Sequence, residues 1–347
     1  MYTIMDYLKY YQNVSFDEVH LNILDHLVLS ILVYLPLNDF KEAKSLEEFS
    51  KEALKLENKE YEGMMIPKSY EVLKYLQKAK RYANMKIMNF VNQKNEKTQF
   101  GACKFLINKK TIIAFKGTDG STIGWVENFR LLYDYPTYTQ RLSLKYLEDN
   151  IKFNDRNVYV VGHSKGGNLA MSSVMELSRP LFKKVKKVYN FDGPGFLKKE
   201  FTSLKYRELL PKLVNIIPTG SVVGALLFNK NYTVVESCEL AFKEHYPTTW
   251  GIFGEFFLEG TLSSISKHLN ESTTIGMDKL ETEKVKEVIE MFLKTIDKKY
   301  DEEFEFNIND IKNLLKNRDL IDPEVAKYLT TMLPKMVFAV TGKNMND

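Results

Sequence analysis

Residues 158–170 read VYVVGHSKGGNLA, and this stretch decides the fold. The β-branched and aromatic residues 157–161 predict a buried strand, and the apolar spacing of residues 168–177 predicts a helix. Ser164 stands at the apex of the turn between them, where Gly162 and Gly166 leave the clearance that a sharp turn needs. The pattern is typical of a nucleophile elbow, which holds a serine exposed beside a general base. The alternative is a glycine-rich turn that carries an inert serine.

The length and composition of the chain exclude several classes of protein. With 347 residues, 44% of them hydrophobic, the chain suffices for one large α/β domain with additions or for two smaller domains. The net charge is only +4 and comes from scattered lysines without a basic-aromatic stripe, so no nucleic-acid partner is expected. Cys103 and Cys238 are far apart and lack metal-ligand spacing, which fits a reducing compartment and predicts no metal site.

The amino-terminal region lacks the pattern of a signal peptide. Its most apolar stretch, residues 21–37, contains Asp25 and His26, so an amphipathic helix is expected there rather than a transmembrane segment. A cytoplasmic location follows by default.

The order of strand-like and helix-like segments indicates an α/β fold. Surface helices are expected at residues 46–59 and 69–82, and a β-hairpin at residues 99–107 and 111–115. Beyond the elbow, strands at residues 185–191, 212–217 and 232–235 alternate with helices or loops, which predicts a mostly parallel sheet flanked by helices. After residue 260 the pattern becomes Lys/Glu-rich and helical, at 281–298, 308–316 and from Asp322 onward.

A serine nucleophile needs a base and an acid. In α/β-hydrolases these follow the serine in the order acid, then histidine. Only two histidines lie beyond Ser164. We expect His245 to be the base because it follows the last predicted strand, whereas His268 lies in a polar, helix-like segment.

The acid is expected at the end of a sheet strand. Asp192 is the only aspartate between Ser164 and His245, and it follows the predicted strand at residues 185–191. Glu236 and Glu239 are the alternative acids. Asp192 could instead serve only as a turn cap before the Gly-Pro pair that follows it.

The oxyanion of an acyl-transfer reaction needs two backbone N–H donors. Lys165, which follows the serine, is expected to supply one. The glycine-bracketed loop at residues 116–120 follows a predicted strand, and the N–H of Thr118 is expected to supply the other, with its hydroxyl as a further donor. An ordinary strand-to-helix turn is the alternative for this loop.

Four segments of the chain carry a family resemblance. They are FKGTD at residues 115–119 with Trp125, GHSKGGNLA at 162–170, FDGPGF at 191–196, and the loop of His245. Over residues 25–250 the chain resembles the class 3 lipases of the α/β-hydrolase superfamily, and more closely a bacterial group of lipase-like proteins. The resemblance implies a serine hydrolase fold with nucleophile Ser164, base His245 and oxyanion donors at Thr118 and Lys165.

The chain departs from this family at two positions. Class 3 lipases usually carry their acid after the next strand, where this chain has Ser221, and they usually have an apolar residue at the position of Lys165. A lysine side chain beside the nucleophile would favour an anionic or phosphate-bearing ester. Apolar residues that could form an acyl pocket, with plain core as the alternative, are Val222, Val223, Leu226, Leu227, Phe228, Phe253, Phe256 and Phe257.

The sequence therefore predicts an α/β-hydrolase domain at residues 1–260, including an amino-terminal helical extension, and a helical appendage packed on it at 261–347. The expected activity is cleavage of carboxylic esters, of small molecules or lipids, through a Ser164–His245–Asp192 triad and an acyl-enzyme. This chemistry needs no metal or organic cofactor. A catalytically silent binding protein, which Ser221 favours, and an acyltransferase are the alternatives.

Overall fold

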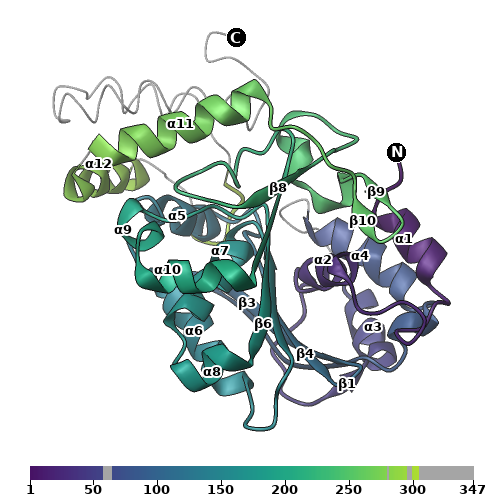
Figure 1. Ribbon diagram of the computed structural model, residues 1–347. Coiled ribbons are helices and arrows are strands. Elements are labelled where there is room, and N and C mark those ends of the chain that lie inside the picture. Colours follow the sequence, from purple (N-terminus) through teal and green to yellow (C-terminus); the bar gives the residue numbers. More distant parts are fainter. Residues whose placement is uncertain (58–64, 280, 295–298, 305–347) are drawn as a thin grey trace.

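An eight-stranded sheet forms the centre of the molecule (Figure 1). The computed structural model describes residues 1–57, 65–279, 281–294 and 299–304. The strands lie in sequence order: β1 (Lys44–Ser45), β2 (Lys86–Asn95), β3 (Thr98–Ile107), β4 (Lys110–Phe115), β5 (Val158–His163), β6 (Val185–Phe191), β7 (Leu213–Pro218) and β8 (Tyr232–Val235). Strands β1 to β4 pair antiparallel, and β4 to β8 pair parallel. The predicted hairpin and the predicted strands after the elbow are confirmed, with β7 displaced by one residue.

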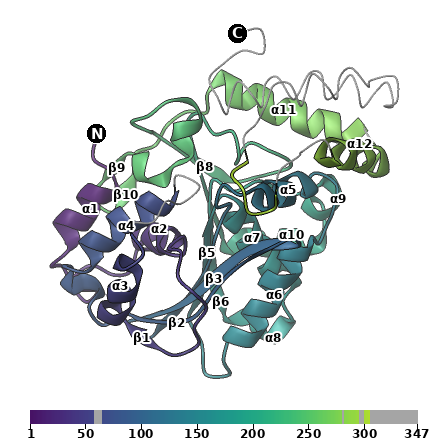
Figure 2. The same cartoon turned by 180° about the vertical axis from the view of Figure 1, so that it is seen from behind.

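Helices cover both faces of the sheet. Figures 1 and 2 show α1 (Ile4–Tyr11), α2 (Ile23–Leu32), α3 (Leu46–Leu54) and α4 (Met65–Leu76) on one side. On the other side lie α6 (Tyr138–Asn150), α7 (Lys165–Glu176), α8 (Arg179–Lys184) and α10 (Leu204–Leu209). A mostly parallel sheet between two helical layers is the α/β-hydrolase fold that the sequence predicts.

Two hydrophobic cores lie on opposite faces of the sheet. In β4, Ile112 and Ala114 belong to the core beneath α2, whereas Ile113 and Phe115 belong to the core beneath α6 and α7. Successive side chains of a strand point to opposite faces, so a strand covered on both sides is apolar at nearly every position, as β4 is here from Ile112 to Phe115. The central strands are therefore rigid supports for the loops at their carboxyl ends.

Helix α2 is more deeply buried than the sequence suggests. The predicted helix is present at Ile23–Leu32, but it is not amphipathic, because every residue from Leu24 to Leu32 is buried. The helix is enclosed between the sheet and the outer helices α1 and α4, and a helix surrounded by protein has no polar face. On its sheet side, the ring of His26 stacks on Tyr189 with 4.2 Å between ring centroids.

A buried ion pair anchors the amino-terminal end of α2. Arg81 Nη2 donates to Asp25 Oδ2 at 2.7 Å and Arg81 Nε donates to Oδ1 at 2.9 Å, with both side chains inaccessible to solvent. The hydroxyls of Tyr7 and Tyr82 also donate to Oδ1, at 3.0 and 2.5 Å. Burial, together with the Asp25 carboxylate, raises the pKa of both tyrosines.

The carboxyl-terminal region begins with two helices, α11 (Ser264–Lys279) and α12 (Thr282–Lys294). Asn270 of α11 donates to the carbonyl of Ala225 at 2.9 Å, and Glu290 of α12 accepts a hydrogen bond from the Tyr133 hydroxyl. The helices predicted at 308–316 and from Asp322 lie outside the described residues. Within the described ranges, no helix has the length and hydrophobicity needed to span a bilayer.

Replacing Asp25 with asparagine should strongly destabilise the fold. The substitution leaves the Arg81 charge buried without its counterion, and breaking one side of such a pair costs about 3–5 kcal/mol. We expect the free energy of unfolding, measured by urea titration, to fall by that amount. Asp149→Asn breaks an ion pair with Lys145 whose side chains are 57% and 72% exposed, and it should change the free energy by less than about 1 kcal/mol. Equal effects of the two variants would contradict this role of Asp25.

Candidate active site

The backbone at Ser164 is strained, with φ 58° and ψ −134°. A positive φ is unfavourable for a residue with a side chain, so the surrounding structure must hold it in place. The Ser164 N–H donates to the carbonyl of Phe191 at 2.9 Å. A Cβ on Gly162 would lie 2.1 Å from the carbonyl oxygen of Gly166, and a Cβ on Gly166 would lie 2.2 Å from that of Phe115. The clearance predicted for the two glycines is therefore confirmed.

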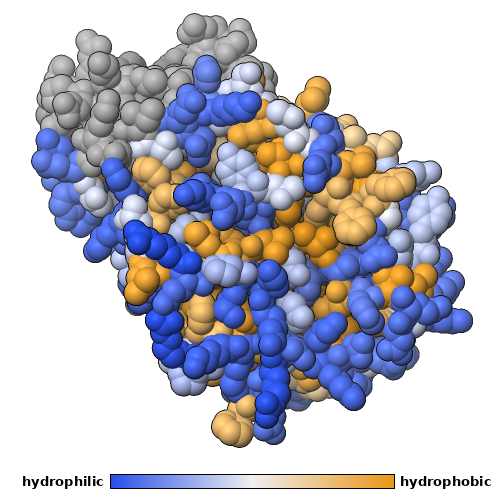
Figure 3. All heavy atoms as spheres, viewed as in Figure 1, coloured by the Kyte–Doolittle hydropathy of each residue, from blue (hydrophilic) through white to orange (hydrophobic). Residues whose placement is uncertain are grey.

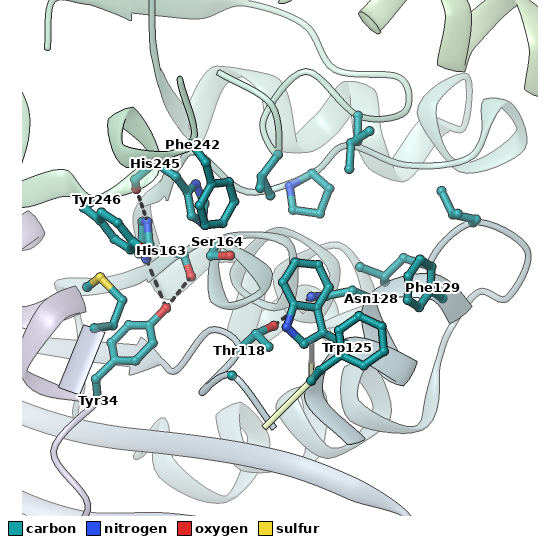
Figure 4. A pocket seen from close by; sticks show the side chains of 18 of the residues that line it. Tyr34, Thr118, Trp125, Asn128, Phe129, His163, Ser164, Phe242, His245 and Tyr246 are labelled. Atoms are coloured by element: carbon teal, nitrogen blue, oxygen red, sulfur yellow. Dashed lines mark hydrogen bonds between the residues drawn. The ribbon is translucent and has the colours of Figure 1, made fainter. Parts of the chain in front are cut away.

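Asp192 and His245 form a buried hydrogen-bonded pair. Asp192 directly follows β6, and His245 ends a short 3-10 helix, Ala241–His245. Nδ1 of His245 lies 2.6 Å from Oδ2 of Asp192 and donates its proton to the carboxylate. Nε2 has no hydrogen-bond partner among the described residues. The ring of His245 and the side chain of Ser164 line one cavity (Figure 4). In the described part of the chain, no direct hydrogen bond joins these two side chains.

Ser221 supports the carboxylate of Asp192. Its hydroxyl donates to Oδ1 of Asp192 at 2.5 Å, and the N–H of Gly224 donates to the same oxygen at 3.1 Å. From the sequence, Ser221 is notable only because the related lipases usually have an acid at its position. Its place after β7, the neighbour of β6 in the sheet, indicates that it faces Asp192.

The alternative acids and the alternative base lie elsewhere. Within the described ranges, Asp192 is the only carboxylate that is hydrogen-bonded to the His245 ring. Glu239 is exposed, and the backbone of Glu236 pairs with Gly251 and Leu258. His268 is exposed on α11 and does not line the cavity.

The loop at residues 116–120 is held by side chains from two elements. Gln99 of β3 donates from Nε2 to the carbonyl of Gly117 at 3.2 Å. Asn128 of α5 (Thr122–Arg130) donates from Nδ2 to Oγ1 of Thr118 at 2.8 Å. The N–H of Lys165, the second predicted donor, opens α7, and the first N–H groups of a helix have no acceptor within the helix.

The side chain of Lys165 is buried away from the cavity, with only 1% of its surface exposed. Its Nζ lies 2.5 Å from Oε2 of Glu127 and also donates to the carbonyl oxygen of Gln99 at 2.9 Å. The interpretation of Lys165 as a cation that favours anionic esters is therefore wrong. A buried ammonium group must be paired, and Glu127 pairs this one.

The cavity beside Ser164 has a volume of about 350 Å³ and mostly apolar walls. Of the predicted acyl-pocket residues, Val223, Leu226 and Leu227 line it. Aromatic residues that the sequence reasoning missed line it as well: Trp125, Phe129, Phe242 and Phe304. The described residues contain no cluster of side chains suited to hold a metal ion.

The other predicted pocket residues do not line the cavity. Phe253 and Phe256 belong to a surface hairpin, β9 (Ile252–Phe253) and β10 (Phe256–Phe257), where they are 73% and 72% exposed. Figure 3 shows hydrophobic residues on the surface in the region where Figure 1 places this hairpin and α1. Val222, Phe228 and Phe257, the remaining predicted pocket residues, do not line the cavity either. The hydrophobicity of a residue alone does not indicate whether it lies in the cavity wall, in the core or on the surface.

Tyr34 and His163 connect the elbow to the loop of His245. His163 Nε2 lies 2.8 Å from the carbonyl oxygen of His245 and donates to it, so Nδ1 accepts from the Tyr34 hydroxyl at 3.0 Å. Figure 4 shows this chain of hydrogen bonds beside Ser164. A Cβ on Gly117 would lie 2.0 Å from the Tyr34 oxygen, so the hydroxyl packs directly against the loop at residues 116–120. The same hydroxyl donates to His163, whose ring in turn donates to the carbonyl of His245.

Burial keeps both members of this connection neutral. Desolvation, followed by the neighbouring His245, holds the pKa of His163 well below its ordinary value. Desolvation likewise raises the pKa of Tyr34. Both side chains are therefore neutral at pH 7.

Comparison with known proteins places the chain in a family. A sequence model of the Mbeg1-like family matches residues 76–294. The chain belongs to the Mbeg1-like family. This family is lipase-like, so the resemblance to lipases expected from the sequence is confirmed at the level of the fold. The match includes Thr118, Ser164, Asp192 and His245 of this Mbeg1-like protein, but neither Tyr34 nor Phe304.

Among solved structures, that of M37 lipase is similar to this Mbeg1-like protein. The two share 15% sequence identity with a TM-score of 0.36, over 91% of this chain and 97% of the lipase chain. No curated protein sequence matches the chain.

Replacing Tyr34 with phenylalanine in this Mbeg1-like protein should lower its stability. The loss of the hydroxyl leaves Nδ1 of the buried His163 without its donor, and an unpaired buried polar group costs about 1–3 kcal/mol. Urea unfolding should show a decrease of this size. Tyr246→Phe is the matched control, because the Tyr246 hydroxyl lines the same cavity without a hydrogen bond to any described residue. A smaller effect of Tyr34→Phe than of Tyr246→Phe would contradict the role given to Tyr34.

Proposed function

We propose that this protein is a serine hydrolase that cleaves carboxylic esters. The observation that carries the proposal is the hydrogen bond of 2.6 Å between Asp192 and His245, in a cavity that also contains Ser164 on a strained turn. A nucleophile, a base and an orienting acid are the three groups that a serine esterase requires.

His245 is the general base in this proposal. Since Nδ1 donates its proton to Asp192, the lone pair of the neutral ring is on Nε2, the nitrogen without a described partner. Nε2 takes the proton of Ser164 Oγ as that oxygen attacks the ester carbonyl. A catalytic hydrogen bond between serine and histidine is often long before the substrate binds and shortens in the complex.

The acyl-enzyme forms and is then hydrolysed. As the bond between the carbonyl carbon and the alkoxy oxygen breaks, His245 Nε2 returns its proton to the leaving alcohol. A water molecule then gives a proton to Nε2 and attacks the acyl carbon. As the bond from that carbon to Ser164 Oγ breaks, Nε2 returns the proton to Oγ, which releases the acid and restores Ser164. All the protein groups that act in these reaction steps are side chains or backbone amides, so the proposal invokes neither a metal nor a cofactor.

Asp192 holds the histidine in the required tautomer. Its carboxylate is fully buried, and the donors Ser221 and Gly224 fix Oδ1 so that Oδ2 faces His245. The same contact stabilises the imidazolium that forms when His245 takes the serine proton.

The oxyanion is stabilised by the N–H groups of Thr118 and Lys165. Hydrogen bonds from Gln99 and Asn128 hold the loop of Thr118 in one conformation. The Thr118 N–H can therefore act as an oxyanion donor without a rearrangement of its loop during the reaction. Because Asn128 donates to Oγ1 of Thr118, the hydroxyl proton of Thr118 remains available as a third donor.

The apolar cavity favours an uncharged, hydrophobic acyl group from a small-molecule or lipid ester. The alternative of a catalytically silent binding protein was favoured by the serine at position 221. This observation no longer favours it, because the Ser221 hydroxyl donates to Asp192, the acid of the proposed triad. Transfer of the acyl group to an alcohol other than water remains the second candidate, and product analysis with added alcohols separates it from hydrolysis.

Ser164→Ala should abolish both ester cleavage and covalent labelling by a fluorophosphonate probe. The lost hydroxyl is small, so the free energy of unfolding should change by about 1 kcal/mol or less. Mass spectrometry of the labelled wild type should place the adduct on Ser164. Unchanged labelling of the alanine variant would exclude Ser164 as the nucleophile.

Two histidine variants provide the control for this assignment. His245→Ala should be as inactive as Ser164→Ala because no base remains, whereas His268→Ala, on exposed α11, should retain normal activity.

Asp192→Asn should lower turnover by about 10⁴-fold, as expected when the acid of a triad is replaced by an amide that stabilises the wrong tautomer. The measurement is kcat with a p-nitrophenyl ester, together with circular dichroism to show that the variant is folded. Glu236→Gln is the control and should retain wild-type turnover. An Asp192→Asn variant with near-normal kcat would disprove the role of this aspartate.

A further inference from the structure

A short segment near the carboxyl-terminal limit of the described chain lies along α5. We call residues 299–304 the strap. It pairs antiparallel with the start of α5 through a bridge between Ser121 and Glu303. The N–H of Thr122 donates to the carbonyl of Glu302 at 2.8 Å, and the N–H of Ile123 donates to that of Tyr300 at 3.0 Å. The first N–H groups of a helix have no hydrogen-bond acceptor within the helix. The carbonyl groups of the strap accept hydrogen bonds from these N–H groups of α5.

The strap is also attached to the end of the oxyanion loop. The N–H of Phe304 donates to the carbonyl of Gly120 at 2.9 Å. Gly120 follows Thr118 by two residues and lines the cavity. The position of Phe304 is therefore set by the same loop that presents a proposed oxyanion donor.

The ring of Phe304 belongs to an aromatic cluster. Its centroid lies 5.6 Å from that of Trp125 and 6.1 Å from that of Phe129, with interplanar angles of 32° and 66°. These are favourable distances for aromatic pairs. All three rings line the cavity that contains Ser164. We call Trp125, Phe129 and Phe304 the aromatic wall.

The aromatic wall faces the catalytic groups across the cavity. Figure 4 shows Trp125 and Phe129 on one side and Tyr34, His163, His245 and Tyr246 on the other, with Ser164 and Thr118 between them. In the proposed mechanism, an acyl group bound to Ser164 therefore shares the cavity with these rings. Trp125 and Phe129 lie on the rigid helix α5 within the family match, whereas Phe304 lies beyond it.

We propose that Phe304 is a specificity-determining residue that limits the length of the acyl group which the cavity accepts. This inference rests on the proposed function. The ring lines the apolar cavity beside Trp125 and Phe129, so an acyl chain that reaches the aromatic wall would contact Phe304. The substrate class that fits is an ester with a short or medium unbranched acyl chain.

The test compares two substitutions of Phe304 in the full-length protein. Activity is measured as kcat/KM for the acetyl, butyryl, octanoyl and dodecanoyl esters of p-nitrophenol. Phe304→Ala opens the wall and should raise the ratio of dodecanoyl to butyryl activity at least about 10-fold, the scale on which hydrophobic pockets discriminate chain length. Phe304→Trp narrows the cavity while keeping an aromatic ring, and should shift the preference toward the acetyl ester.

Phe253→Ala is the matched control, because Phe253 is an aromatic residue on the exposed hairpin outside the cavity. This variant should keep the wild-type chain-length profile. A profile unchanged in both Phe304 variants would overturn the proposal, and so would a shift of the same direction in Phe304→Ala and Phe304→Trp.

A binding experiment separates this inference from the proposed catalysis. Calorimetry measures the affinity of butyrate and of dodecanoate for Ser164→Ala and for the double variant that also carries Phe304→Ala. The second substitution should increase the affinity for dodecanoate relative to butyrate by about 10-fold. This result would support the role of Phe304 even if no ester were cleaved. Equal ratios in the two proteins, or no binding by either, would reject it.

Discussion

The strained turn at Ser164 is the constraint on which the arrangement of the site depends. A backbone with φ 58° is maintained there because β5 and α7 are packed tightly, with glycines where any side chain would collide. The turn sends consecutive residues in different directions. His163 reaches the carbonyl of His245, Ser164 lines the cavity, and the side chain of Lys165 is buried against Glu127. Three adjacent residues thus contact three separate parts of the site.

Features encoded locally could be predicted from the sequence, and those that depend on distant partners could not. The strand, turn and helix around Ser164, and the position of Asp192 at the end of a strand, follow from short patterns. The environment of Lys165 depends on Glu127, which only the folded chain brings near. The roles of Phe253 and Trp125 were equally hidden, because an aromatic residue has the same hydrophobicity on a surface hairpin as in a cavity wall.

The amino-terminal helices are an integral part of the site rather than an accessory layer. The Asp25–Arg81 pair anchors the start of α2, and Tyr34 follows the end of the same helix. Just beyond its end, this helix places the Tyr34 hydroxyl that donates to His163 beside Ser164. A residue before the family match therefore contacts a residue within it.

The contact between Asp192 and Ser221 bears on which other side chains the position of Ser221 would accept. These residues follow neighbouring strands, and the histidine requires a carboxylate oxygen at one point in space, whichever strand carries it. A chain with aspartate at both positions would hold one of the two carboxyls protonated, because like charges in contact are not both ionised when buried. The protonated group would then donate a hydrogen bond, as the Ser221 hydroxyl does. A carboxyl group at the position of Ser221 would thus take over the contact of the hydroxyl and leave the hydrogen bond between Asp192 and His245 in place.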